Sequence, residues 1–258
     1  MAAASPGNTP GTSKTDFLRS VREALGRPSA GAGRAAPPAR AYHRLEETLP
    51  NLEEQAAELD LRLREKRPQL LNRFAEMAGR GGWNVHRVPG VEAAIGRVDS
   101  LVGEAKANLV VRSGQPVFDD VPVDTALEWK GIEVTPIVHG DNAPREELRE
   151  TIRHADIGLT GTDYALAETG SLVIMPRLGL SRLVSLVPPL HIALVRPEEV
   201  LETLHDLFLL RRLEYYRRGG EMGSYLNFIT GPSRTADIEM TIVQGVHGPR
   251  SVHLVLIE

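Results

Sequence analysis

Hydrophobic positions follow a helical spacing in the first part of the chain and an alternating one later. From Leu45 to Leu63, leucine or alanine recurs every three or four residues with charged residues between them, which predicts an amphipathic helix. Pro50 and Pro68 suit the first turn of a helix, so we expect helices to start or kink there. Residues 42–82 are therefore predicted to form a helical extension that packs on its own domain, with docking on a partner as the alternative.

Short apolar runs alternate with helix-like segments after the glycine pair at 81–82, which itself indicates a helix end. Strands separated by helices of ~10–15 residues indicate βαβ units and a mainly parallel sheet. Tyr164–Glu168 and Leu172–Met175 flank a Thr-Gly-Ser turn and are expected to pair as a hairpin, and Pro197–Arg218 has the pattern of one long helix. The fold class predicted for residues 83–258 is α/β, with a mainly parallel sheet flanked by helices. The other expected strands are 83–88, 108–112, 132–138, 156–160, 190–195, 224–230 and 251–257, and the other expected helices are 91–106, 123–130 and 145–154.

The first 41 residues differ from the rest in composition, since 27 of them are Ala, Gly, Pro, Ser or Thr. Such a segment buries too little apolar surface to offset the entropy lost on ordering, so we expect it to be disordered. Within it, Thr15 is expected to cap a short helix that carries Phe17, Leu18, Val21 and Leu25 on one side.

Charge and cysteine content exclude several classes of protein. The chain has 258 residues, with 34 acidic and 30 basic side chains, and its net charge of −4 does not favour a nucleic-acid partner. We find no apolar run of the ~20 residues that span a bilayer and no secretory signal, so we expect a cytoplasmic protein without a membrane span. The lack of cysteine excludes disulfides, thiolate nucleophiles and Cys-ligated zinc or iron–sulfur clusters in this chain. The histidines show no ligand-like spacing, so no metal site is expected.

The first of three candidate segments is GLTGTD, at the predicted end of a strand, where open α/β sheets bind ligands. Gly161 permits unusual backbone angles, and the Thr160 hydroxyl and the Asp163 carboxylate can converge on a ligand beside it. The alternative is a turn that merely ends the strand, held by Asx or Thr hydrogen bonds.

The second candidate segment is ETGS, in the turn of the predicted hairpin. Thr169, Gly170 and Ser171 can present successive backbone N–H groups and two hydroxyls, which suit a phosphate or a carboxylate. Glu168 beside them is a candidate general base. The alternative is a glycine-containing turn with a solvated glutamate.

The third candidate segment, TGPSRTADIE, follows a predicted strand. After Gly231 and Ser233 we expect a turn that starts a short helix, whose free N–H groups attract anions. Arg234 can bind a carboxylate or phosphate through two hydrogen bonds, with Thr235 and Asp237 close by in the sequence. The alternative is helix capping by Ser233 or Thr235, with a local pair between Arg234 and Asp237.

Standard catalytic motifs are absent from the sequence. It has no phosphate-binding loop, HExxH zinc motif, nucleophile elbow or complete dinucleotide fingerprint. His247, within GVHGP, is expected near the third segment, and it joins Glu168 as a catalytic candidate. His191 follows two prolines and is expected to be a strand histidine with satisfied hydrogen bonds.

Three runs of sequence, GLTGTDYALAETGSLVI, PPLHIALV and FITGPSRTADIEMTIVQGVHGP, resemble the LUD-domain family of the lactate utilization protein C type. The resemblance covers Trp83 to Glu258, and ETGS and TGPSRTADIE are its most specific parts. Ser171 stands where the motif commonly has Thr, which keeps the hydroxyl. The motif positions carried over are Glu168, Thr169, Gly170, Ser171, Gly231, Ser233, Arg234 and Asp237.

The resemblance implies a fold similar to the sugar-phosphate isomerase and coenzyme A transferase group. It also implies a non-redox role beside two iron–sulfur partner proteins that oxidise L-lactate to pyruvate, with no cofactor in this chain. Arg234 and the N–H groups of Thr169 to Ser171 would then hold a small anionic substrate. Two alternatives stay open: an enzyme acting on a phosphorylated or CoA-linked molecule, and an assembly module that docks through the leucine seam. A homo-oligomer is compatible with each.

Overall fold

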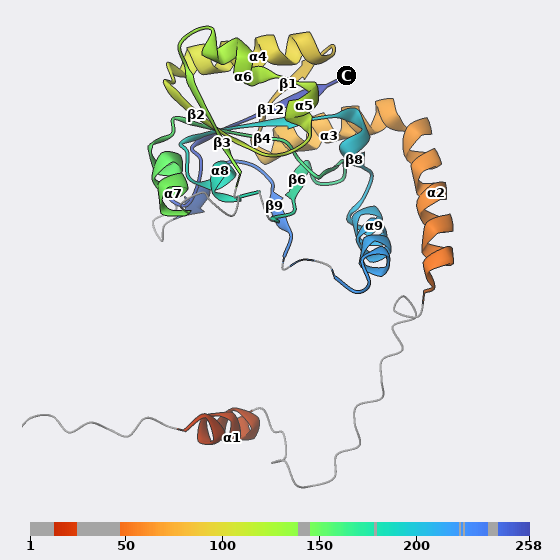
Figure 1. Ribbon diagram of the computed structural model, residues 1–258. Coiled ribbons are helices and arrows are strands. Elements are labelled where there is room, and N and C mark those ends of the chain that lie inside the picture. The colour runs from red at the N-terminus through yellow and green to blue at the C-terminus, as the bar shows by residue number, and fades with distance from the viewer. Residues whose placement is uncertain are drawn as a thin grey trace, which may run out of the picture. The chain divides into compact units, whose positions relative to one another are not determined.

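The computed structural model describes residues 13–24, 47–138, 145–177, 180–221, 223, 225–236 and 242–258 (Figure 1). The chain divides into two units, residues 1–47 and 48–258. In the first unit, helix α1 (Lys14–Ala24) begins two residues earlier than expected, because the Ser13 hydroxyl accepts the N–H of Asp16 at 3.2 Å. Ser13 is therefore the cap, and not Thr15. The rest of the predicted disordered tail, with Leu25, lies outside the described residues.

Two helices open the second unit, α2 (Leu49–Glu65) and α3 (Arg67–Gly81), and each has its proline in the first turn as predicted. Gly82 ends α3 in the left-handed conformation, with φ of 100°. The leucine seam of α2 is buried in the same core as the strands. Packing on its own domain is thus confirmed for the described part of the seam, and a role as an exposed docking surface is wrong; Leu45 lies outside the described residues.

Six strands form a wholly parallel sheet, which confirms the predicted fold class. Its central strands are apolar on both faces, as expected for a sheet covered on both sides. In order across the sheet they are β1 (Asn84–Val88), β12 (Ser251–Ile257), β7 (Leu190–Val195), β4 (Ile157–Thr160), β2 (Leu109–Ser113) and β3 (Glu133–Ile137).

A second sheet of four strands lies beside the first, in the order β8-β5-β6-β9. Its centre is the predicted hairpin, in which β5 pairs antiparallel with β6 and Leu166 faces Ser171. A separate two-stranded hairpin joins β10 to β11. These strands are β8 (Val200–Leu201), β5 (Tyr164–Leu166), β6 (Ser171–Ile174), β9 (Asn227–Ile229), β10 (Arg234–Ala236) and β11 (Ile242–Gln244).

Helices cover both faces of the parallel sheet (Figure 1). One face packs against α4, α5 and α6 around Val110 and Leu194. The other face packs against α2, α3, α9 and the second sheet around Ala193 and Leu254. A smaller core around Val111 joins α7 and α8 to the sheet. The helices not yet bounded are α4 (Val91–Ala105), α5 (Val117–Asp120), α6 (Val123–Glu128), α7 (Arg145–His154), α8 (Leu183–Leu186) and α9 (Leu204–Arg217). Within the described ranges, no helix is both long and apolar enough to cross a bilayer.

The single long helix expected over Pro197–Arg218 is wrong. A 3₁₀ turn at Pro197–Glu199 leads into β8, which pairs with Ala165 and Leu166 of β5. The helix α9 starts only afterwards, where the Thr203 hydroxyl accepts the N–H of Asp206 and the Asp206 carboxylate accepts the N–H of Thr203. This capping box, together with the strand pairing, divides the segment.

Candidate functional site

The first candidate segment lies at a topological switch point of the parallel sheet. Strand β2 continues to β3 on one side, whereas the next strand of this sheet after β4 is β7, on the other side. Open α/β sheets bind ligands outside the carboxyl ends of such strands. Thr160 closes β4, and Gly161 follows against Val117 and Gln115, with a Cβ at Gly161 placed only 2.6 Å from Cγ1 of Val117. Glycine is therefore required there by close packing.

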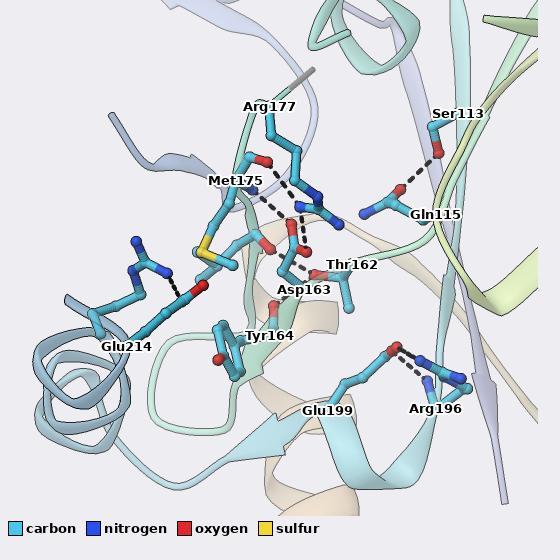
Figure 2. A network of polar contacts seen from close by, with 12 residues as sticks. Ser113, Gln115, Thr162, Asp163, Tyr164, Met175, Arg177, Arg196, Glu199 and Glu214 are labelled. Atoms are coloured by element: carbon cyan, nitrogen blue, oxygen red, sulfur yellow. Dashed lines mark hydrogen bonds and ion pairs between the residues drawn. The ribbon is translucent and has the colours of Figure 1, made fainter. Parts of the chain in front are cut away.

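Polar groups at this edge bond mostly to one another (Figure 2). The Asp163 carboxylate accepts the N–H of Met175 at 2.7 Å and a guanidinium N–H of Arg177 at 2.8 Å. Ser113 donates its hydroxyl proton to Oε1 of Gln115 at 2.6 Å. The Nε2 of Gln115 is buried and has no partner among the described residues. One buried amide donor thus remains available beside Gly161, while Asp163 serves to hold the turn.

The second candidate segment is a closed turn. The N–H groups of Thr169 and Gly170 both donate to the carbonyl of Leu166, at 3.3 and 2.8 Å. They are not the free N–H groups that the ETGS pattern predicts for an anion cradle. Gly170 has φ of 68°, and a Cβ there would lie 2.5 Å from Cα of Ala78 in α3. The glycine therefore allows the turn to pack directly on the α3 backbone.

Hydroxyl groups connect this turn to the third segment. Thr169 donates its hydroxyl proton to Oγ of Ser171 at 2.8 Å, and Ser171 bonds to the hydroxyl of Thr230 at 2.8 Å. Ser171 is buried, and Thr230 follows β9 directly. The serine that replaces the commoner threonine of the motif thus keeps a structural hydrogen bond.

Glu168 faces a different part of the molecule from Arg234. Its Oε1 accepts the N–H of Leu204 at 2.6 Å, at the start of α9. It lines an open hollow of about 560 Å³ together with residues of α3, and neither Arg234 nor His247 lines that hollow. The sequence leaves open whether Glu168, Arg234 and His247 converge; Glu168 lines a different hollow from the other two and caps the N-terminus of α9.

Replacing Glu168 with alanine is expected to lower the free energy of unfolding by about 1 kcal/mol, because the N–H of Leu204 loses its acceptor. Ligand binding at Arg234 should be unchanged. Urea unfolding and calorimetric titration of the same preparation check the two statements. Glu221→Ala is the control, since the Glu221 carboxylate is exposed and makes no hydrogen bond recorded among the described residues. A loss of binding in Glu168→Ala at normal stability would restore the role as a base.

The third candidate segment forms a hairpin instead of a helix start. Arg234–Ala236 is the strand β10, paired antiparallel with β11. Before it, the N–H of Ser233 donates to the carbonyl of Pro249 at 3.1 Å, and the Ser233 hydroxyl accepts the N–H of His247 at 3.2 Å. The expected helix N-terminus is therefore wrong, because these backbone groups are paired with the returning chain.

A cavity of about 270 Å³ lies behind this hairpin. Gly231, Ser233, Arg234 and His247 line it, so these four predicted residues do come together. His191 and Val252 also line it, at the beginnings of β7 and β12, so the cavity does not lie at the carboxyl ends where ligands were expected. Its other lining residues are Ser185, Leu186, Asn227, Phe228, Ile229, Thr230, Gly248 and Pro249. Asp237 and the side chain of Thr235 lie outside the described residues.

Arg234 is the charged group of this cavity. No acidic side chain occurs among the described residues that line it. Gly82 leaves the space in which the guanidinium lies, since a Cβ at Gly82 would clash with Arg234 and would lie 3.0 Å from Cδ of Pro232. A single arginine in a small cavity of mixed polar and apolar lining, without a described carboxylate, is suited to a small anion.

His191 is a residue whose role the sequence pattern missed. Its Nε2 bonds to the hydroxyl of Thr160 at 2.8 Å, but its Nδ1 is buried and has no partner in the described structure. The expectation that His191 has hydrogen-bond partners on both ring nitrogens is therefore confirmed for Nε2 and wrong for Nδ1. Complete burial lowers the pKa of His191 to about 3, so the imidazole is neutral. The Nδ2 of Asn227, another lining residue, is also buried without a described partner.

Metal-ligating side chains do not cluster in the part of the chain that the structure describes, where no group of three His, Asp or Glu residues is placed to hold an ion. The polar side-chain groups of the described residues that line the cavity are one guanidinium, three hydroxyls, one amide and two imidazoles.

The fold defines the class: an α/β domain with a parallel six-stranded sheet between layers of helices. Within that class, the model of the LUD domain family matches residues 71–257, and the chain belongs to this family. The resemblance based on the ETGS and TGPSRTADIE segments is thereby confirmed.

Curated relatives of this chain are bacterial proteins named lactate utilization protein C. That of Halalkalibacterium halodurans is 35% identical over 162 residues, which cover 62% of this chain and 67% of the relative. That of Bacillus subtilis is 33% identical, over 56% of this chain and 63% of the relative. A relative from an Exiguobacterium species is 41% identical, over 45% and 50%. The matches thus span between half and two-thirds of these relatives.

A solved structure shares the fold. The crystal structure of a DUF162 family protein from Deinococcus radiodurans superposes with a TM-score of 0.52 and 25% sequence identity. The match covers 74% of this chain and 98% of that protein. The comparison extends the α/β assignment to a related protein of known structure.

Proposed function

We propose that this chain is a non-redox subunit of a cytoplasmic L-lactate utilization system and that the cavity behind the β10–β11 hairpin binds a carboxylate ligand. The relatives named lactate utilization protein C support a role in lactate utilization. The second part rests on one observation, namely that Arg234 lines a cavity with Ser233, Thr230 and His247 and without a described acidic residue.

The side chains that line the cavity at Arg234 can bind both functional groups of a 2-hydroxy acid. The guanidinium of Arg234 presents a planar fork that pairs with a carboxylate through two charge-assisted hydrogen bonds. The hydroxyls of Ser233 and Thr230 can donate to the same carboxylate or accept the proton of the 2-hydroxyl group. Charge then supplies the attraction, and the hydroxyls set the orientation.

Proton transfer in the proposed reaction is assigned to His247. Oxidation of lactate to pyruvate breaks the O–H and Cα–H bonds and releases two electrons and two protons. The hydroxyl proton needs a base at the cavity, and the Cα hydrogen would leave together with the two electrons toward the partner proteins. His247 is exposed and lines the cavity, whereas Glu168 lines another hollow. The electrons would pass to iron–sulfur proteins acting as partners, since this chain has no cysteine to hold such a cluster.

Arg234→Gln is expected to weaken the binding of L-lactate at least tenfold, because the charged fork is lost while the polar side chain remains. Isothermal titration calorimetry of the purified full-length chain measures the effect. Arg80→Gln removes an arginine from the exposed surface of α3, where it pairs with Glu76, and is the matched control. Equal affinity in Arg234→Gln and wild type would remove the assignment of Arg234.

Membership in the complex needs a separate test. The tagged chain is purified under native conditions, its partners are identified by mass spectrometry, and lactate-dependent dye reduction is measured. Recovery of cysteine-rich iron–sulfur proteins with lactate activity is the expected result. A colourless, partner-free preparation would instead favour an enzyme that acts alone on a phosphorylated or CoA-linked molecule.

A further inference from the structure

Arginine side chains surround two adjoining hollows that are separate from the cavity at Arg234. The first, of about 270 Å³, lies between α7 and the start of α8, and the second, of about 430 Å³, lies against α9. Pro176 and Tyr225 line both of them. No residue that lines either hollow also lines the cavity at Arg234. A ligand here would therefore occupy a second site.

The first hollow has only basic charges in its described wall. Arg145, Arg149 and Arg182 line it, and no acidic side chain does. Arg149 forms an exposed ion pair with Glu146 at 3.2 Å, whereas neither Arg145 nor Arg182 has an ion pair within the described part of the chain. The guanidinium of Arg182 lies over the ring of Tyr225, 5.3 Å from its centroid. This stacking holds the guanidinium in place and leaves its N–H edge available for an anion.

The second hollow has more arginines than carboxylates. The ion pair of Asp163 and Arg177, which lies beside Tyr164 and Met175 in Figure 2, is part of its lining. Glu214, its other acidic residue, pairs with Arg211 and with Arg218. Both acidic residues are thus already engaged by arginines. Arg217 also forms an ion pair, with Glu53 at 3.1 Å, so the arginines without a described ion pair all line the first hollow.

This concentration of positive charge departs from the composition of the chain. The protein as a whole has a net charge of −4, yet seven arginines and two acidic residues line these two hollows. Charges of one sign that line a concave surface reinforce each other and attract an oppositely charged ligand. Glu53 and Glu146, which line neither hollow, pair with Arg217 and Arg149, so the excess is three positive charges, and a multiply charged ligand fits better than an anion with one charge.

We propose that the two hollows together form a binding site for a diphosphate group, either free or as the ester of an organic molecule. One phosphate would be bound by Arg182, Arg149 and Arg145, and the other by Arg177 and Arg218 on the far side of Tyr225. Guanidinium groups match phosphate oxygens in geometry and form two parallel hydrogen bonds with them. The hollows are of the size in which small ligands are held, and they adjoin along Pro176 and Tyr225.

The test titrates the full-length protein calorimetrically with inorganic pyrophosphate and ADP, and with inorganic phosphate and AMP as ligands that carry a single phosphate. We expect pyrophosphate or ADP to bind at least tenfold more tightly than its single-phosphate counterpart. Tight binding of pyrophosphate indicates that the free group suffices, and tight binding of ADP alone indicates an ester. The proposal would be overturned if neither pyrophosphate nor ADP bound saturably. It would also be overturned if inorganic phosphate and AMP bound as tightly as pyrophosphate and ADP.

Variants then locate the site. The double variant Arg149→Gln, Arg182→Gln is expected to weaken the binding of the tighter diphosphate ligand at least tenfold. Arg153→Gln is the control, because Arg153 lies on the same helix, pairs with Glu150 and lines neither hollow. Unchanged affinity in a double variant that melts at the wild-type temperature would also overturn the proposal. Lactate binding at Arg234 should be unaffected, so this test and that of the proposed function fail independently.

Discussion

Replacing Gly170 with alanine is expected to destabilise the domain by about 3 kcal/mol or more. Two costs add at this position. Its φ of 68° lies in the left-handed region, where a residue other than glycine loses roughly 1–2 kcal/mol. A Cβ would also lie 2.5 Å from Cα of Ala78, so α3 must shift, at a cost of about 1–3 kcal/mol. The free energy of urea unfolding, followed by circular dichroism, measures the sum.

Gly96→Ala is the matched control for this substitution. Gly96 lies inside α4, and a Cβ there would meet no atom within 4 Å. Alanine is the better helix former by about 1 kcal/mol, so this variant should be more stable than wild type. A loss of less than about 1 kcal/mol in Gly170→Ala would show that α3 yields easily, and would contradict a structural role for the motif glycine.

Protonation of His191 is expected to make the fold sensitive to acid. Burial lowers the pKa of His191 to about 3 in the folded protein, against 6.5 for an ordinary histidine. Between these values the unfolded chain binds a proton that the folded chain does not. Stability therefore falls as the pH is lowered through this window, by about 1.4 kcal/mol per pH unit from this residue alone. His191→Gln, which cannot titrate, should lose that part of the slope between pH 6 and pH 4.

The measurement is the unfolding free energy at several pH values for wild type and variants. Thr160→Val is the control, because it removes the partner of Nε2 but keeps the imidazole. Its stability should be lower at every pH, with the slope of wild type. The pKa of His86 is also lowered, to about 4, by burial and by the charge of Arg97, so part of the acid sensitivity should remain in His191→Gln. Parallel curves for wild type and His191→Gln would contradict the prediction.

Local patterns were sufficient to predict most of the fold. The helices that start at Pro50 and Pro68 and the parallel strands follow from proline positions and apolar periodicity, which act within a few residues. The break before α9 was not predictable in this way. It depends on Val200 and Leu201 pairing with β5, a contact between distant parts of the chain that helix-like periodicity does not reveal.

The candidate site was predicted less completely than the fold. Arg234, Ser233 and His247 lie close in the sequence and do line one cavity. Glu168 lines a different hollow, which the sequence could not show, because the position of the ETGS turn depends on the contact of Gly170 with α3. The sequence could not show that the Nε2 of Gln115 and the Nδ1 of His191 are buried without a hydrogen-bond partner, because the lack of a partner depends on tertiary packing.

The hydroxyl chain from Thr169 through Ser171 to Thr230 gives the ETGS turn an electrostatic effect on the cavity. Thr169 donates to Ser171, so the proton of Ser171 is free to point to Thr230. In that arrangement the O–H dipoles run in one direction and polarise one another, and Thr230 keeps its own proton for a group outside the chain. Because Thr230 lines the cavity, the turn would present a strengthened donor there, and the proposed affinity for a carboxylate would be raised by residues that never touch the ligand.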